Sequence, residues 1–175
     1  STYHKLALAH YFLDKKEQKN IAFNNINNFG WKISDEDKYA QKFYENAVFP
    51  NKSLAKARYL SDGGYFEKAL TELKNKAFSS SEEIEELNYR YGRIYDLKGN
   101  YNKALVYYKK ASIDKDKNQT YYAPNACLKA AIILINNDNK QEAKELLKKA
   151  IAYKNHEYEN SIEMKAKSLL KTIDN

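Results

Sequence analysis

The sequence predicts an all-α protein, and three observations support this prediction. Only five glycines, two prolines and two valines occur among 175 residues, so residues typical of hairpin turns and of strands are scarce. Apolar residues recur at steps of three and four, as in Ala104, Tyr108 and Ala111. No segment alternates apolar and polar residues with a period of two.

Three helices are expected in the first third of the chain, at about 2–14, 17–29 and 35–47. Gly30 is a stop signal for the second of them, and Ser34 followed by Asp37 has the spacing of a capping box that begins the third. Apolar faces are formed by Leu8, Ala9 and Phe12, and by Ala22, Ile26 and Phe29. Residues 1–49 are therefore interpreted as a degenerate helical hairpin plus an extra helix, whose packing the sequence does not define.

Seven further helices are expected, at about 52–62, 65–77, 81–98, 101–112, 121–136, 140–153 and 159–174. The side chains of Ser80 and Asn139 each precede an acidic residue by three positions, so both can cap a helix start. Turn signals separate the segments at Gly63–Gly64, Gly99–Asn100 and Asn136–Asn139.

A short sequence motif recurs within these helices. Gly64–Leu70 and Gly99–Leu105 are two nearly identical copies 35 residues apart, and Asp138–Lys144 is a weaker third copy. A small residue precedes each copy at a constant distance, at Ala57, Gly92 and Ala131, and Ala166 continues the series. Small residues on paired helices let the two backbones approach closely, while large neighbours fill the groove.

These residues resemble the tetratricopeptide repeat, a helix–turn–helix motif of 34 residues. The resemblance covers about residues 50–155, as repeats at about 50–84, 85–120 and 124–155, and 156–175 would form a capping helix. It implies a right-handed α–α superhelix, or solenoid, of antiparallel helical hairpins, with the whole chain as one solenoid domain. The packing residues that it implies are Ala57, Ala69, Gly92, Tyr95, Ala104, Tyr108, Ala131 and Ala143.

Two segments extend this resemblance. Tyr121–Ala126 and the tail Tyr158–Leu170 are similar to the carboxy-terminal part of bacterial tetratricopeptide proteins akin to the eukaryotic tetratricopeptide-repeat domain 39 family. The similarity implies that a longer repeat array precedes Ser1.

The sequence offers no catalytic constellation, so we expect a protein that is not an enzyme and has no cofactor or metal. His4, His10 and His156 lack the spacing of metal ligands on one helix face. The single cysteine, Cys127, falls at a packing position of the third repeat and is expected to be an inert core thiol. For Tyr107–Tyr108 and Tyr121–Tyr122 we expect one ring inside and one outside, rather than a platform for stacking bases.

The family resemblance also implies a concave groove, formed by the first helix of each repeat. Carried onto this sequence, the groove positions include Arg58, Tyr89, Arg90, Arg93 and Lys129. All three arginines of the chain belong to this set. Arginine binds carboxylates in two-point contacts better than lysine does, so an acidic or carboxyl-terminal peptide is a possible ligand. The alternative is that these arginines only pair along their helices, Arg90 with Glu86, Arg58 with Asp62 and Arg93 with Asp96.

We therefore expect a non-catalytic scaffold that binds a peptide or a partner protein. A net charge of +7 leaves a nucleic-acid-binding helical repeat as a rival, although the lysines are interleaved with acidic residues as on a solvated face. A self-assembly module is a third possibility. No apolar run is long enough to span a bilayer, and a soluble compartment, cytoplasm or periplasm, is expected, with an upstream leader left open.

Overall fold

The structure is a computed structural model that describes residues 2–74, 76–113 and 120–174. Within these ranges it contains ten helices and no strand, and neighbouring helices pack on one another. The prediction of an all-α protein is thereby confirmed. Packing divides the chain into two compact units, one that ends at Lys52 and one that begins at Ser53, called the first unit and the second unit below.

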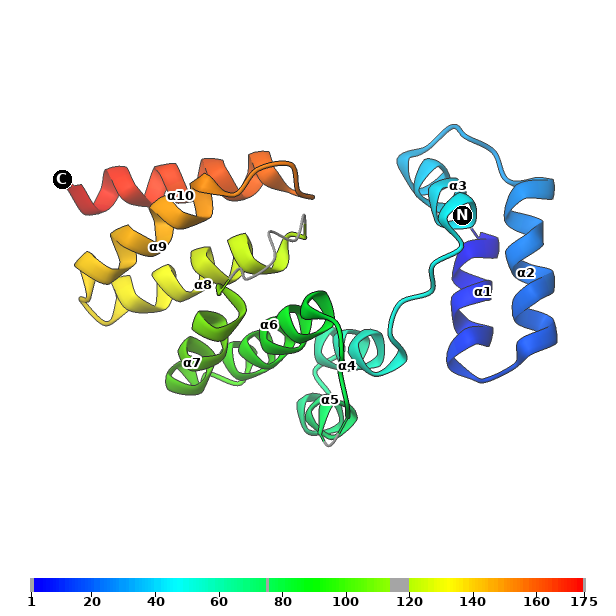
Figure 1. Cartoon of the computed structure of the whole chain (residues 1–175), viewed down its shortest axis with the longest axis horizontal. Helices are drawn as coiled ribbons and strands as arrows, with labels where there is room; N and C mark the ends of the chain where they lie inside the picture. The colour runs from blue at the N-terminus through cyan, green and yellow to red at the C-terminus, as the bar shows by residue number, and fades with distance from the viewer. Residues whose placement is uncertain (1, 75, 114–119, 175) are drawn as a thin grey trace. The chain divides into compact units, whose positions relative to one another are not determined.

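The first unit contains three helices: α1 (Thr2–Phe12), α2 (Lys16–Phe29) and α3 (Asp35–Asn46). α1 and α2 lie side by side as a hairpin, and α3 packs on α2 (Figure 1). Ser34 caps α3 in a complete capping box with Asp37. Aromatic rings fill the space between the helices, since Phe43 contacts both Phe23 and Phe49.

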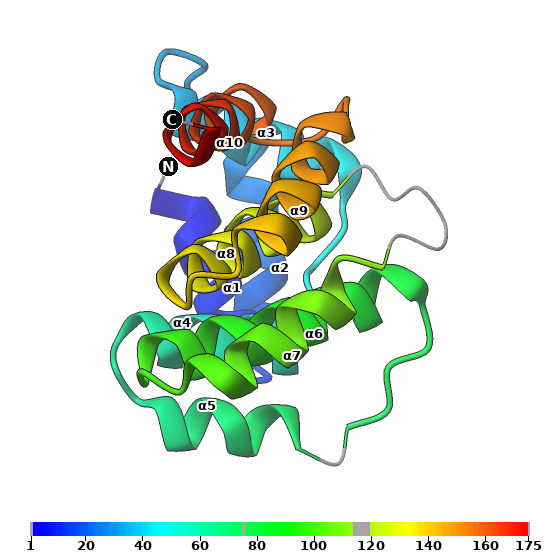
Figure 2. The same ribbon diagram turned by 90° about the vertical axis from the view of Figure 1, so that its left-hand side faces the viewer.

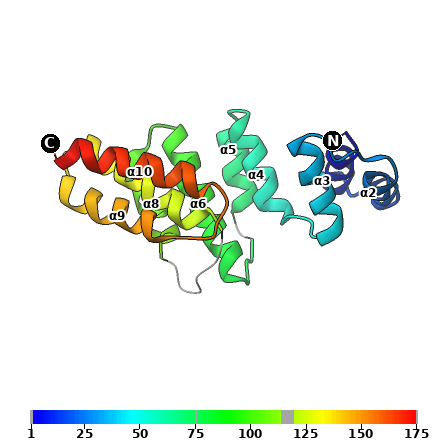
Figure 3. The same ribbon diagram turned by 90° about the horizontal axis from the view of Figure 1, so that it is seen from above.

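The second unit contains the remaining helices: α4 (Lys52–Asp62, whose first residue is the boundary), α5 (Phe66–Leu73), α6 (Ser81–Leu97), α7 (Tyr101–Ala111), α8 (Tyr122–Asn136), α9 (Lys140–Ala152) and α10 (Glu159–Asp174). α6 pairs with α7 and α8 pairs with α9, and Figure 2 shows both pairs. α10 packs along α9 and also contacts α8 (Figure 3).

α5 is shorter than expected. It ends at Leu73, and Lys74 has an extended backbone, whereas the sequence predicted a helix to about residue 77. Leu73 is the last residue of this helix and is buried in the core. Lys76, which stands where the other copies have a small buried residue, is exposed, so nothing holds a further turn against the core.

Four helix pairs share one turn. Two residues after α1, α4, α6 and α8, the chain takes a left-handed backbone conformation, at Asp14, Gly64, Gly99 and Asp138. In each turn the next amide donates to a carbonyl five residues back, with N···O distances of 2.8–3.0 Å. This pattern closes the carbonyl end of the first helix and reverses the chain. The α1–α2 hairpin thus has the same turn as the three hairpins of the second unit.

Close approach of α6 and α7 depends on Gly92. A Cβ atom at this position would lie 2.5 Å from Cδ1 of Tyr108, which is buried and whose hydroxyl donates to Asp96 at 3.1 Å. The other small residues expected to pack, Ala57, Ala69, Ala104, Ala131 and Ala143, are all fully buried. Tyr95 is half-buried and stacks on Tyr107.

The core of the second unit is built in three clusters along the chain. Leu54 and Leu73 join Ile94 in the cluster formed by α4, α5 and α6. α10 closes the last cluster, because Ile162, Ala166 and Ile173 are buried against residues of α8 and α9. Its lysines at 165, 167 and 171 are exposed.

Candidate functional site

A cavity of about 270 Å³ opens among the helices of the second unit. Its lining residues come from α4, α6, α8 and α10, together with Tyr121 and Tyr158, which immediately precede α8 and α10. α5, α7 and α9 contribute no lining residue. The cavity is therefore built from the first helix of each hairpin and from α10, the next helix in that alternation.

Four of the five residues predicted to line a groove line this cavity. Arg58 comes from α4, and Tyr89, Arg90 and Arg93 come from α6. Lys129 does not line it, because α8 faces the cavity with Asn125 and Leu128, one helical turn apart.

Arg90 is part of a buried ion pair. Its side chain is 4% exposed, and its guanidinium donates to Glu86 at 2.7 and 2.9 Å. The rings of Tyr89 and Tyr122 lie on the same guanidinium, with its central carbon 5.6 and 5.3 Å from their centroids. Burial opposes the charge of Arg90, but Glu86 and nearby tyrosines outweigh it and raise its pKa. Removal of one partner of such a pair typically costs about 3–5 kcal/mol, so Arg90 is a structural element of the wall.

Arg93 and Arg58 converge on Asp62. Arg93 donates to Asp62 across two helices at 2.9 Å, and Arg58 lies 3.9 Å from the same carboxylate. The alternative of pairing along the helices is thus present for Arg90 and Arg58, but it is wrong for Arg93, because Asp96 instead accepts from the Tyr108 hydroxyl. The side chains of Arg58 and Arg93 are 52% and 37% exposed, so both charges reach the open side of the cavity.

Tyrosines form one wall of the cavity. The ring of Tyr89 contacts Tyr121 edge-on and lies 5.5 Å from Tyr122, and Tyr121 meets Tyr158 at 86°. Tyr121 and Tyr122 are both half-buried and 4.5 Å apart, so the expectation of one inward and one outward ring is wrong there. The reason is that the start of α8 packs on α6, where both rings contact Tyr89. In the other pair Tyr108 is buried, and Tyr107 stacks on Tyr91 and Tyr95.

The Tyr89 hydroxyl connects α6 with α8. The side-chain amide of Asn125 donates to it at 2.7 Å. Burial is the main cause of the raised pKa of Tyr89, with Tyr121 adding to it and the two arginines opposing it. The hydroxyl therefore stays protonated at neutral pH.

The start of α8 is held by a residue of α6. The carboxylate of Glu85, 6% exposed, accepts from the Thr120 hydroxyl and from the Ala123 amide. The bond to the Ala123 amide satisfies one of the backbone donors that a helix start leaves without a partner. Glu85 therefore fixes the segment that carries Tyr121 and Asn125.

The sequence interpretation missed the contribution of α10. Tyr158, Ser161, Ile162 and Lys165 all line the cavity. The sequence predicts only a capping helix there, although its small residue, Ala166, continues the series of Ala57, Gly92 and Ala131. That series was the sequence signal that α10 is equivalent to the first helices of the three hairpins and lies beside the cavity as they do.

Reactive side chains do not gather in the described part of the chain. No group of three or more metal-binding side chains occurs there. Cys127 is fully buried, and burial raises the pKa of its thiol to about 12. Among the described helices, none is both long and apolar enough to cross a membrane.

Comparison of the chain with protein-family models, with curated proteins and with solved structures finds no match.

Proposed function

We propose that the second unit is a right-handed solenoid of tetratricopeptide-like hairpins, and that it works as a non-catalytic scaffold that binds a peptide in the cavity. The turn shared by its three hairpins and the buried small residue seven positions before each turn support the architecture. In such stacks each hairpin buries its faces against its neighbours and leaves a concave surface formed by one helix of each pair.

One observation carries the functional proposal: the cavity is lined by successive first helices, with charged groups from α4 and α6 and polar groups beside apolar ones from α8 and α10. Arg58 and Asp62 come from α4, and Asn125 and Leu128 come from α8. Groups spaced along several helices suit an extended peptide, which has a polar backbone and a side chain at every residue.

A nucleic-acid-binding role has less support at this site. Arg90 is enclosed by Glu86 and two rings, and Arg93 shares Asp62 with Arg58. Phosphate contacts require exposed cations, and each phosphate contact adds to the salt dependence of binding.

The test is to select peptides from a random library with the purified full chain, and then to measure binding of a selected peptide by fluorescence anisotropy. The blocking variant is Ser161→Trp, which places an indole at the cavity wall. Ser168→Trp is the matched control, two turns further along α10 and also exposed. We expect the first variant to lose the peptide and the second to keep it, with both melting like the parent chain.

Two results would contradict the proposal. The first is equal binding by both tryptophan variants, which would place the ligand elsewhere. The second is a library that yields no peptide while homopolymeric RNA binds with a steep dependence on salt, which would favour the nucleic-acid alternative.

A further inference from the structure

The connection between α2 and α3 in the first unit carries large apolar side chains that face the solvent. Phe29 is the last residue of α2, and Trp31 and Ile33 follow it within the connection. These three residues are 61%, 73% and 75% exposed. In the described part of the second unit, no segment of five residues contains three exposed large apolar residues. Single exposed apolar residues are common on protein surfaces, whereas a group of them marks an interaction surface.

The first turn of α1 joins the two ends of this connection. The ring of Tyr3 lies 6.0 Å from the ring of Phe29, and the next residue, His4, meets the exposed ring of Tyr39 in α3 edge-on. The exposed apolar residues from the three elements therefore form one patch at this end of the unit. This patch, called the apolar tip below, consists of Phe29, Trp31, Ile33 and Tyr39.

The apolar tip projects from the first unit. The connection runs out beyond the ends of α2 and α3 (Figure 1), and its two apolar residues are the most exposed of the patch. A protein partner would need a pocket shaped to receive them, because interface anchors are stabilised by tight packing. A lipid surface is fluid and admits projecting side chains without a preformed pocket.

The residue types at the tip match the layers of a membrane surface. Tryptophan and tyrosine rings favour the boundary between headgroups and acyl chains, because each combines an apolar ring with a polar group. Phenylalanine and aliphatic side chains favour the acyl side of that boundary. The tip has Trp31 and Tyr39 of the first kind and Phe29 and Ile33 of the second. Among the described helices none can cross a membrane, so contact through the tip would be peripheral.

The charges beside the tip indicate which lipid it suits. Two lysines and three acidic residues lie between Phe29 and Tyr39, so this segment has no positive excess that would attract an anionic lipid. Lys32 and Asp35 are both exposed, and a phosphocholine headgroup carries a charge complementary to each of them. A zwitterionic lipid therefore fits the segment better than an anionic one.

We propose that the apolar tip inserts into the surface of a membrane of zwitterionic phospholipid, with Trp31 and Ile33 reaching the acyl boundary. Lys32 then lies near lipid phosphates, and the acidic start of α3 lies near the headgroup ammonium groups. This interaction uses the first unit and is separate from peptide binding in the cavity of the second unit. It adds a membrane-attachment role to that of a scaffold.

Trp31 itself provides the measurement, because it is the only tryptophan of the chain. The full chain is titrated with phosphatidylcholine vesicles while the tryptophan emission is recorded. We expect a saturable shift of the emission to shorter wavelength, since the indole leaves water. Lipids brominated on the acyl chain should quench the emission, and bromine near the headgroup should quench more strongly than bromine near the chain end. An unchanged spectrum would overturn the proposal.

Ile33→Ser is the decisive variant, because it removes an apolar contact and keeps the reporter. It should lower the partition coefficient about tenfold, as expected when one large aliphatic side chain no longer leaves water. Val48→Ser is the matched control, since Val48 is 71% exposed in the same unit but lies outside the tip. Trp31→Ser, followed by co-sedimentation with vesicles, should also lose binding. Melting curves of all three variants should match that of the parent chain, and equal partition of Ile33→Ser and Val48→Ser would refute the role of the tip.

Two further results would reassign the patch or the attachment. An emission shift that grows with protein concentration in the absence of lipid would make a second copy of the chain the occupant of the patch. Binding that requires anionic phosphatidylglycerol, weakens steeply with salt and is unaffected by Ile33→Ser would show attachment through surface lysines instead. Either result overturns the lipid proposal, and neither bears on peptide binding, which is measured with Ser161→Trp and Ser168→Trp.

Discussion

The α1–α2 hairpin of the first unit and the α6–α7 hairpin of the second share a turn but pack differently. Ala7 and Gly92, both buried, stand seven residues before the left-handed residue of their turns. Five residues after it the second unit has the buried Ala104, whereas the first unit has Lys19, whose amine lies over the ring of Phe49. Nine residues after it Tyr108 is fully buried, whereas Phe23 is only half-buried.

The comparison indicates that one turn serves hairpins that pack differently, and that a small residue at the matching position of both helices accompanies deep burial of the aromatic ring. Where Lys19 stands in place of a small residue, the ring of Phe23 is only half-buried, and apolar side chains of the first unit remain exposed. Phe29, Trp31 and Ile33 of the first unit are 61%, 73% and 75% exposed. Four predictions test this contrast.

Removal of α10 should have the largest effect. A chain that ends at Asn155 lacks Ile162, Ala166 and Ile173, and it exposes their partners on α8 and α9. A buried large aliphatic side chain contributes about 1.5–3 kcal/mol, so several such losses are comparable with the stability of a typical domain, about 5–15 kcal/mol. We expect aggregation or loss of a cooperative melt, measured by circular dichroism and size-exclusion chromatography. A monomeric truncation that melts cooperatively would show that the second unit does not depend on its last helix.

Gly92→Leu should have the next largest effect, because it tests close approach in the second unit directly. Even a Cβ atom would meet the Tyr108 ring at 2.5 Å, and overpacking of this kind costs roughly 1–3 kcal/mol or more. Chemical denaturation measures the loss. Ala152→Leu, at an exposed position near the end of α9, is the control and should change stability by less than about 0.5 kcal/mol. An unchanged midpoint for Gly92→Leu would refute the close crossing of α6 and α7.

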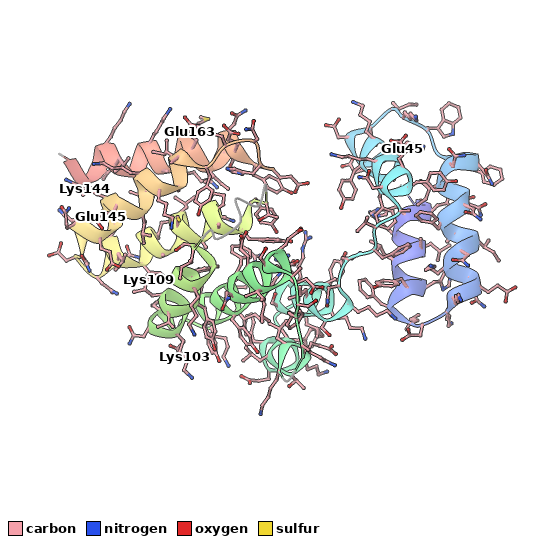
Figure 4. The ribbon with its side chains drawn as sticks, in the orientation of Figure 1. Glu45, Lys103, Lys109, Lys144, Glu145 and Glu163 are labelled. Carbon is pink, nitrogen blue, oxygen red and sulfur yellow. The ribbon has the colours of Figure 1, made fainter. Side chains whose placement is uncertain are left out.

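Acid should weaken the two units in different pH ranges. Burial between α1 and α3 lowers the pKa of His4 below its ordinary value of 6.5, so its contribution to the first unit is present above that pH and lost as pH falls below it. Hydrogen bonds from Lys154 and Lys167 lower the pKa of Glu163 in α10 (Figure 4) from 4.5 to about 2, so its contribution to the second unit is lost only between those values.

The pH contrast is measured by melting curves from neutral pH to pH about 2. His4→Phe should remove the loss near pH 6, and Glu163→Gln should remove a small component at lower pH. Glu145→Gln on the exposed face of α9 serves as the control for the second variant. Parallel acid profiles of His4→Phe and the parent chain would contradict the first assignment.

Trp31→Ser should have the smallest effect on stability. The indole is 73% exposed, so its removal should change the free energy of unfolding by less than about 0.5 kcal/mol. Ile26→Ala in the same unit is the contrast, because Ile26 is 1% exposed and a cavity there costs about 2–5 kcal/mol. Equal losses in denaturation curves would mean that Trp31 is packed rather than exposed.

The sequence predicted the helices well because their limits depend on local chemistry. Ser34, Ser80 and Asn139 each accept the backbone hydrogen bond that their spacing indicated. The length of α5 was mispredicted, because its end depends on whether residue 76 meets a core, which is a tertiary property. Four of the predicted groove residues line the cavity, because each lies on the face of α4 or of α6 that borders it. The residues that share one face of a helix can be read from the helical period of the sequence.

The remainder of the site depends on contacts between distant residues. Arg93 pairs with Asp62, which lies 31 positions earlier in the chain, rather than with Asp96. Local spacing indicates only Asp96, three positions along the same helix, and gives no sign of a partner on α4. The same holds for Lys129, since the side of α8 that faces the cavity is fixed by its packing on α6 rather than by its own apolar pattern.

The bond between Glu85 and the Ala123 amide has a consequence for motion. That amide belongs to α8, yet its acceptor lies on α6, 38 positions earlier. Its hydrogen can exchange with solvent only when the two helices separate at this point, whereas most amides of a helix exchange when their own helix frays. The exchange rate at Ala123 therefore reports how often the walls that carry Tyr89 and Asn125 part. A peptide that bridges them would slow this exchange in proportion to its occupancy.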